Sequence, residues 1–135
     1  MNHSLRIGQH TLGIDPMTQR DRMDEATGVI LRLLREDKPF TYKSDWFELN
    51  DAMLQIKPVQ EELPVVSATS ASPAGMKVAG KYGVGVISIA SVTNEGLAAL
   101  PTQWAFGETY AKEYGNTIDR KNWRVLTQFH IAPTK

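Results

Sequence analysis

Residues 63–83 form the stretch that most constrains the fold, because a strand-like run is joined to a helix-like run by a short polar loop. The apolar run Val65 to Ala68 is bounded by a proline and by small polar residues, as is typical of a buried strand. Ser72 offers an N-cap hydroxyl, and Pro73 stands at the first helical position, where a missing N–H does no harm. Apolar residues at helical spacing follow, and Gly83 is expected to end the helix.

A junction of this kind is suited to binding an anion. Backbone N–H groups at the start of a helix, together with the positive end of the helix dipole, point at one spot where a phosphate fits. The same residues also fit an ordinary strand-to-helix turn with a Ser-Pro cap. The pattern taken by itself leaves both interpretations open.

The composition excludes several classes of function. The 135 residues form at most one domain, and they carry 15 basic and 15 acidic residues, so the formal net charge is zero. Nothing therefore favours electrostatic capture of nucleic acid or of an anionic membrane. The absence of cysteine excludes disulfides, thiolate catalysis and zinc–thiolate sites. The apolar runs are too short to cross a bilayer and the first residues do not resemble a signal peptide, so we expect a cytoplasmic protein.

The first half of the chain is predicted to contain one long helix and a set of small strands. Apolar residues at helical spacing predict an amphipathic helix from Pro16 to Arg35, with Asp15 as its N-cap. Phe40–Tyr42 and Trp46–Leu49 are predicted to be short extended pieces around a polar turn, and Met53–Ile56 is a third apolar piece. Together they predict a small antiparallel excursion before the main strand.

The second half is predicted to continue the alternation of strands and helices. Val84–Ala90 is apolar and rich in β-branched residues, which predicts a strand buried on both faces and hence part of a parallel sheet. Thr93 or Asn94 is expected to cap the next helix, which Pro101 is expected to interrupt and restart. A third strand is predicted over Arg124–Ile131.

This alternation predicts an α/β fold with three parallel strands side by side and connected by right-handed crossovers. Both edges of such a sheet would be exposed parallel strands. We therefore expect the chain to be a piece of something larger, and in isolation to self-associate or to fold only partly.

Four groups of motifs, in order and at fitting spacing, carry a resemblance from residue 12 to the end of the chain. They are Leu12–Pro16 with Gln19–Arg20 and Arg22–Ala26, then Phe47–Leu54 with Lys57–Gln60, then Ser70–Gly75 with Ala79–Gly85, and finally Trp123–Val125 with His130–Ala132. These motifs resemble the luciferase-like flavin-dependent monooxygenase family, in its limonene-monooxygenase-like branch. The third group is similar to that family's flavin-phosphate loop and the helix that follows it.

The resemblance implies a partial TIM-type (β/α)₈ barrel. A complete barrel needs on the order of 250 residues, so residues 1–135 would be a single, incomplete segment from its middle third. The family chemistry implies reduced flavin mononucleotide (FMN), delivered by a separate flavin reductase, and molecular oxygen, which together oxygenate a small apolar organic substrate. Sister branches of the family use a deazaflavin coenzyme without oxygenation, which remains the alternative cofactor. A homo-oligomer is also compatible with the resemblance.

The resemblance also implies a set of cofactor-binding residues. They are Ser70, Ala71, Ser72, Gly75, Ile89 and Ala90. The backbone N–H groups of Ala71 and Ser72 and the Ser72 hydroxyl would face the phosphate, with Ser70 as a neighbouring candidate. Gly75 would permit close approach. Ile89 and Ala90, at the C-terminal end of a strand, would line the ring pocket.

No catalytic residue and no metal site are predicted. The early strands that carry the catalytic histidine of the family have no counterpart in these residues. His3, His10 and His130 do not have metal-ligand spacing, and each fits a tail, surface-loop or structural role. Two classes of function remain open. One is a flavin-dependent monooxygenase or a segment of one, and the other is a non-catalytic flavin-binding remnant or truncated barrel fragment.

Overall fold

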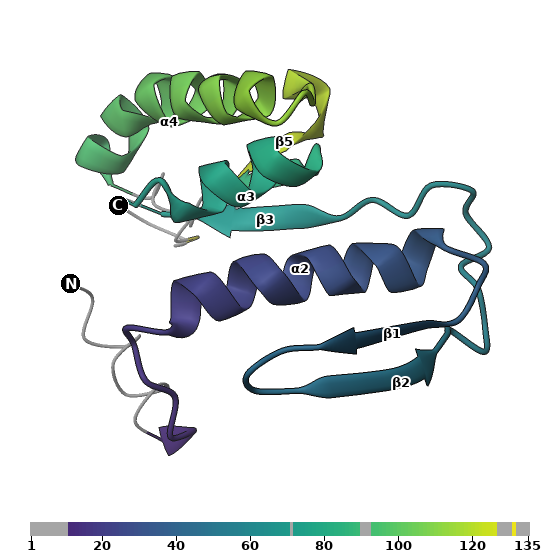
Figure 1. The fold of residues 1–135 in the computed structure, drawn as a ribbon. Helices are drawn as coiled ribbons and strands as arrows, with labels where there is room; N and C mark the ends of the chain where they lie inside the picture. The colour runs from purple at the N-terminus through teal and green to yellow at the C-terminus, as the bar shows by residue number, and fades with distance from the viewer. Residues whose placement is uncertain (1–10, 71, 90–92, 127–130, 132–135) are drawn as a thin grey trace. The chain divides into compact units, whose positions relative to one another are not determined.

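A computed structural model describes residues 11–70, 72–89, 93–126 and 131. The chain divides into two compact units, Met1–Leu63 and Pro64–Lys135. The first contains a helix and a hairpin, and the second contains a parallel sheet with its helices (Figure 1).

The N-terminal unit consists of helix α2 (Gln19–Arg35) and a hairpin of β1 (Phe40–Lys43) and β2 (Glu48–Ala52). The two strands are antiparallel, with Tyr42 opposite Leu49, which confirms the predicted excursion. The third apolar piece, Met53–Ile56, was expected to be extended but lies in no strand. Ala52 already pairs with Phe40, the first residue of β1, so no partner remains for the chain beyond it.

Helix α2 begins three residues after the predicted start, so the prediction of Asp15 as its N-cap is wrong. The Asp15 carboxylate accepts a hydrogen bond from the Met17 N–H at 2.9 Å, and the Asp15 carbonyl oxygen accepts one from the Thr18 N–H at 3.2 Å. Asp side chains often bond the backbone two residues ahead in this way and so form a turn in place of a helix. The turn over Asp15–Thr18 therefore precedes the helix and is not its first turn.

A carboxylate on α2 binds the hairpin through three donors. Glu25 accepts hydrogen bonds from Tyr42 Oη at 2.9 Å, Ser44 Oγ at 3.1 Å and Trp46 Nε1 at 2.6 Å. These bonds, that from Trp46 first, hold the pKa of Glu25 below its usual value of 4.5, although desolvation opposes the shift. The ionised form of Glu25 is thus the form that the hairpin favours.

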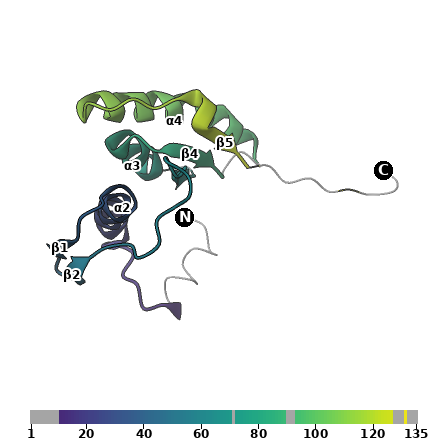
Figure 2. The same ribbon diagram turned by 90° about the vertical axis from the view of Figure 1, so that its right-hand side faces the viewer.

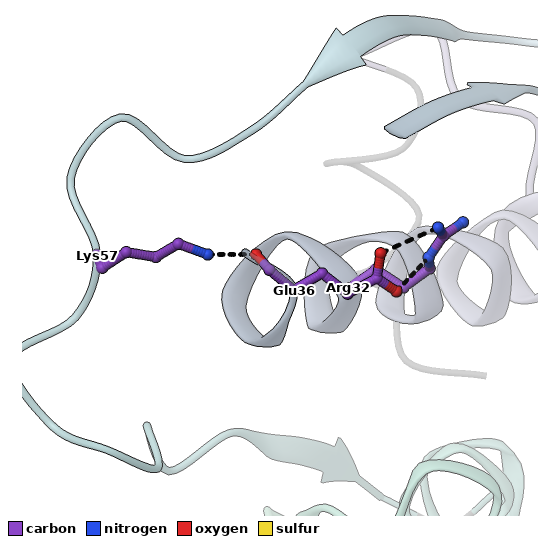
Figure 3. Close-up of polar contacts among 3 residues, drawn as sticks. All are labelled: Arg32, Glu36 and Lys57. Atoms are coloured by element: carbon purple, nitrogen blue, oxygen red, sulfur yellow. Dashed lines mark hydrogen bonds and ion pairs between the residues drawn. The ribbon is translucent and has the colours of Figure 1, made fainter. Parts of the chain in front are cut away.

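The C-terminal end of α2 is bound by a lysine from the segment after the hairpin (Figure 3). Lys57 Nζ donates to the carbonyl oxygen of Glu36, and it lies 3.4 Å from an Asp37 carboxylate oxygen. A cation there satisfies an unpaired carbonyl and complements the helix dipole. The Glu36 side chain turns back to Arg32, with Nε–Oε1 at 2.8 Å and Nη2–Oε2 at 3.1 Å, and this pair lowers the pKa of Glu36. The pair is well exposed, so it contributes little to stability.

The C-terminal unit has the predicted α/β alternation. Its elements are β3 (Val66–Thr69), α3 (Ala74–Tyr82), β4 (Gly85–Ser88), α4 (Asn94–Glu113), a 3₁₀ turn η1 (Arg120–Asn122) and β5 (Trp123–Val125). The strands are parallel in the order β3-β4-β5, as expected. Figures 1 and 2 show α3 lying against the strands and α4 packed on α3. The third strand was predicted over Arg124–Ile131; the ladder extends to the Leu126 N–H, which donates to Ser88 O, and residues 127–130 lie outside the described residues.

Strand β4 is not buried on both faces, in contrast to the prediction for Val84–Ala90. Val86 and Ser88 are buried on the face that α3 and α4 cover, whereas Gly85 and Ile87 on the other face are only half-buried. Successive residues of a strand point to opposite faces, so the difference in burial follows from the difference in cover.

Helix α4 runs through Pro101 without a break, so the predicted interruption is wrong. Thr93 Oγ1 caps the helix by accepting from the Gly96 N–H at 3.0 Å. Proline removes one helical hydrogen bond at a cost of about 3 kcal/mol. Buried residues lie on both sides of that defect, Gly96 before it and Trp104 and Ala111 after it, and they anchor the helix.

Helices α3 and α4 cross at glycines. A Cβ added to Gly80 would lie 2.7 Å from the Ala111 backbone nitrogen and 2.8 Å from the Gly107 carbonyl oxygen. Because these neighbours are backbone atoms, they cannot move away as a side chain can. The predicted end of α3 is confirmed, since Gly83 has a φ of 64° and its N–H bonds the Ala79 carbonyl oxygen.

We predict that Gly80→Ala lowers the free energy of unfolding by about 1–3 kcal/mol, because the new methyl group forces α3 and α4 apart. The gain in helix propensity, which favours Ala over Gly by about 0.5–1 kcal/mol, offsets only part of this loss. Urea unfolding followed by circular dichroism measures the change. Thr109→Ala, at an exposed position of α4, serves as the control and is expected to stay within about 0.5 kcal/mol of wild type. A Gly80→Ala variant as stable as wild type would show that the helices do not depend on this contact.

We predict that the hairpin contacts of Glu25 are lost on acidification. The folded-state pKa lies below 4.5, so the ionised cluster is present above about pH 4.5 and is lost as pH falls through the lower value. The indole N–H resonance of Trp46, followed by NMR, should therefore titrate with an apparent pKa below 4.5. Glu25→Gln should abolish that titration, and Glu48→Gln, which leaves the cluster intact, should preserve it. Titration of the indole that persists in Glu25→Gln would contradict the assignment.

Candidate functional site

Three of the predicted site residues stand at the C-terminal edge of the sheet. Thr69 at the end of β3 pairs with Ser88 at the end of β4, and the Ile89 N–H donates to the Thr69 carbonyl oxygen at 2.9 Å. Ser70 therefore lies at the same edge as Ile89. Ser70 and Ser72 are half-buried, and Ile89 is 40% exposed. Parallel pairing thus brings together loop residues and an apolar residue that are far apart in sequence.

The loop after β3 leads into a helix start that no side chain of the described residues caps. Pro73 occupies the N-cap position, with φ −74° and ψ −1°, and α3 begins at Ala74. The prediction of Ser72 as N-cap is therefore wrong. The first helical hydrogen bond runs from the Lys77 N–H to the Pro73 carbonyl oxygen at 2.9 Å, so Ser72 stands one residue before the N-cap position. The N–H groups of the first helical turn, those of Ala74 to Met76, have no acceptor within the helix and stand at this edge.

Gly75 brings α3 close to β3. A Cβ added there would lie 2.9 Å from the Ala68 carbonyl carbon and 2.9 Å from the Thr69 Cβ atom. Gly75 was predicted to permit the close approach of a ligand. The packing of α3 on β3 requires a glycine at this position whether or not a ligand binds there. This contact sets where the N-terminus of α3 lies relative to the end of β3.

A chain of polar side chains, of which Ser88 and Gln103 are buried and Trp123 is half-buried, lies beneath the loop. Trp123 Nε1 donates to Ser88 Oγ at 2.8 Å, Ser88 Oγ donates to Gln103 Oε1 at 3.2 Å, and Gln103 Nε2 donates to the Ser70 carbonyl oxygen. Ser88 is 0% exposed and Gln103 is 5% exposed. On the other side, Thr69 Oγ1 donates to the Ser72 carbonyl oxygen at 3.3 Å. The loop is therefore attached to the core at two of its carbonyl groups.

Two tryptophans support this arrangement. The rings of Trp104 and Trp123 stack with centroids 4.9 Å apart and 24° between their planes, and the Arg120 guanidinium lies 5.2 Å from the Trp104 ring centroid. Trp104 is 2% exposed, and within the described part of the chain its Nε1 has no hydrogen-bond partner. The stack holds β5 against α4 and so fixes the indole that donates to Ser88.

Two of the predicted site residues and the three histidines lie beyond the part of the chain that the structure describes. Ala71 and Ala90 lie outside the described residues, as do His3, His10 and His130. Ser88, Gln103 and Trp123 were not among the predicted site residues. The signal that was available for Ser88 is a polar residue in an otherwise apolar strand, but its partners lie 15 and 35 residues away, and no local pattern connects them.

Three parallel strands with helices between them, and with a helix start at the carboxyl edge, form the architecture of part of a (β/α)₈ barrel. Residues 6–135 match the luciferase-like monooxygenase family, and the chain belongs to this family.

Two relatives are monooxygenases of known substrate. The chain is 41% identical over 135 residues to 4-hydroxyprotoasukamycin monooxygenase of Streptomyces nodosus subsp. asukaensis, with 98% of this chain and 36% of that protein covered. It is 43% identical over 124 residues to limonene 1,2-monooxygenase of Rhodococcus erythropolis, with 92% of this chain and 32% of that protein covered. The chain thus spans about a third of the length of these relatives.

Solved structures share the fold. An F420-dependent secondary alcohol dehydrogenase, in complex with an F420-acetone adduct, matches with a TM-score of 0.65 and 29% identity over 83% of this chain and 32% of that one. A monooxygenase from Streptomyces bottropensis matches with a TM-score of 0.70 and 17% identity, over 87% of this chain and 35% of that one. A third match is the oxygenating constituent of 3,6-diketocamphane monooxygenase from Pseudomonas putida, in complex with FMN. Its TM-score is 0.55 and its identity is 21%, over 78% of this chain and 31% of that one. Among the described helices of this chain, none is long and apolar enough to cross a membrane.

Proposed function

We propose that this chain is one segment of a (β/α)₈ barrel domain that binds the phosphate of FMN at the β3–α3 loop, in a flavin-dependent monooxygenase. The observation that carries the proposal is the uncapped start of α3 at the carboxyl edge of a parallel sheet. Identity above 40% to two monooxygenases supports the reaction class. Active sites of such barrels lie at this edge of the sheet.

The residues at this edge fit a flavin phosphate. The N–H groups of the first turn of α3 supply donors, and the helix dipole favours a dianion. The Ser72 hydroxyl adds a donor from the loop, and Ala71, which the resemblance places beside it, adds a backbone N–H. Ser70 and Ser72 have their carbonyl oxygens bonded to buried side chains, so these oxygens do not compete for the site.

The apolar side of the cofactor is assigned to the end of β4. Ile89 is 40% exposed and stands next to the loop, so it offers an apolar surface to a flavin ring, with Ala90 following it. Reduced flavin, delivered by a separate reductase, would supply the electrons for oxygen activation. These residues would bind and orient the cofactor and keep water from its ring. The substrate would be a small apolar organic molecule.

A deazaflavin coenzyme is the competing cofactor, since one structural relative binds F420. The identity to that dehydrogenase is 29%, against 41% and 43% to the two monooxygenases, which favours FMN. Parallel titrations with FMN and with F420 decide between them, and tighter binding of F420 would replace FMN in the proposal.

We predict that Ser72→Asp weakens FMN binding far more than Ser72→Ala does. Loss of the hydroxyl removes one donor, worth about 1 kcal/mol or several-fold in affinity. A carboxylate near the phosphate costs about 2–4 kcal/mol at an effective dielectric near 20. The fold should tolerate the change, because an acidic residue before a helix N-terminus interacts favourably with the dipole. Fluorescence titration with FMN measures the affinities.

Thr117→Asp is the matched control for this charge change. Thr117 is exposed and its backbone lies near Gly83, at the opposite end of α3 from the loop. We expect its FMN affinity to stay within about twofold of wild type, since exposed charges more than about 10 Å apart are largely screened. Equal affinities of wild type and Ser72→Asp would place the phosphate elsewhere and leave the loop as an ordinary turn.

A further inference from the structure

Gln103 contacts the proposed phosphate loop although it comes from a helix 33 residues further along the chain. Its Nε2 donates to the carbonyl oxygen of Ser70, the first residue after β3. Gln103 is 5% exposed, so water does not replace this bond readily. Leaving a buried carbonyl oxygen without a donor costs more free energy than leaving an exposed one without a donor. The bond is therefore a strong constraint on the loop conformation.

The orientation of the Gln103 amide is determined by its other neighbours. The indole N–H of Trp123 can only donate, so Ser88 Oγ accepts from it at 2.8 Å. The hydroxyl proton of Ser88 is then directed to Gln103 Oε1 at 3.2 Å. With its oxygen used as an acceptor, the amide must present Nε2 to Ser70. Three neutral side chains from α4, β4 and β5 thus form one directional series of hydrogen bonds.

An anion site on backbone amides needs its carbonyl oxygens turned away from the anion. The Ser70 and Ser72 carbonyl oxygens are held by Gln103 and Thr69, both of which are buried. Each bond keeps the negative end of a peptide dipole toward the core. A loop without these bonds can turn a carbonyl toward the phosphate, and the N–H of the same peptide group then turns away from it, so affinity is lost.

We propose that Gln103 is a positioning residue for phosphate binding, which keeps the Ser70 carbonyl directed into the core, with Ser88 and Trp123 fixing the orientation of its amide. The proposal rests on the proposed function, because it concerns how the same loop recognises the phosphate of the flavin. Gln103 does not itself touch the cofactor. We expect Gln103 to affect the binding of the flavin phosphate and not the binding of the flavin ring.

The test compares FMN with riboflavin, which has the same ring and no phosphate. In Gln103→Met, which keeps the volume and removes both hydrogen bonds, FMN affinity should fall about tenfold, while riboflavin affinity stays within about twofold of wild type. A role limited to overall packing would weaken both ligands alike. Both titrations use the full chain at a temperature where its circular dichroism spectrum matches that of wild type.

Gln103→Glu provides a second readout if the methionine variant does not fold. An ionised carboxylate still accepts from Ser88 but places a second acceptor against the Ser70 carbonyl oxygen, so FMN affinity should fall at pH 8. A protonated carboxyl group donates to Ser70 again, and burial raises the pKa of such a group. The ratio of wild-type to variant FMN affinity should therefore return toward one at pH 5.5. Thr102→Glu, which adds the same charge at the exposed neighbouring position, should show no such recovery.

The outcomes separate the two proposals. If wild type binds FMN no more tightly than riboflavin, the proposed phosphate site is wrong and this inference fails with it. If wild type prefers FMN and the Gln103 variants keep the same preference at both pH values, the positioning role alone is overturned. A lost preference in Gln103→Met, or a pH-dependent recovery in Gln103→Glu that Thr102→Glu lacks, supports it.

Discussion

Close backbone contact on both sides of α3 is the constraint on which the C-terminal unit depends. Gly75 lets the helix lie against β3, and Gly80 lets α4 lie against the helix, with distances that leave no room for a Cβ at either position. A helix held this tightly has little freedom to shift along its axis. The start of α3 therefore stays at the carboxyl edge of the sheet, where its N–H groups would face the ligand that we propose.

The layer between the sheet and α4 is unusually polar for a core. Thr69, Ser88 and Gln103 are buried there, and Ser67 lies on the same face. Burying hydroxyl and amide groups is costly unless they are bonded. Here Thr69 and Gln103 use their donors on loop carbonyl groups, and Ser88 fixes Gln103. The polar core is thus explained by the need to hold an irregular loop, whose carbonyl groups have no strand partner of their own.

Sequence periodicity predicted the elements and their parallel order because those depend on local residue patterns. The failures share a different cause. The start of α2 depended on which of several competing hydrogen bonds forms at Asp15, and the N-cap of α3 depended on the Pro73 carbonyl accepting the first helical bond. The continuity of α4 through Pro101 depended on packing that the local sequence does not contain. The series of hydrogen bonds from Trp123 to Ser70 could not be predicted from the sequence for the same reason. Its members are brought together only by the pairing of the strands and the crossing of the helices.

The two units use polar groups in chemically different ways. In the N-terminal unit one ionised carboxylate, Glu25, collects three donors from the hairpin, so that assembly depends on a charge. In the C-terminal unit the bonds to Ser70 and Ser72 come from neutral side chains, whose donors do not titrate near neutral pH. A carboxylate in that place would repel a bound phosphate, and a lysine would bind it in any loop conformation. Neutral donors shape the loop without adding a charge of their own, so in the proposed site recognition of an anion would be left to the backbone amides and the dipole of α3.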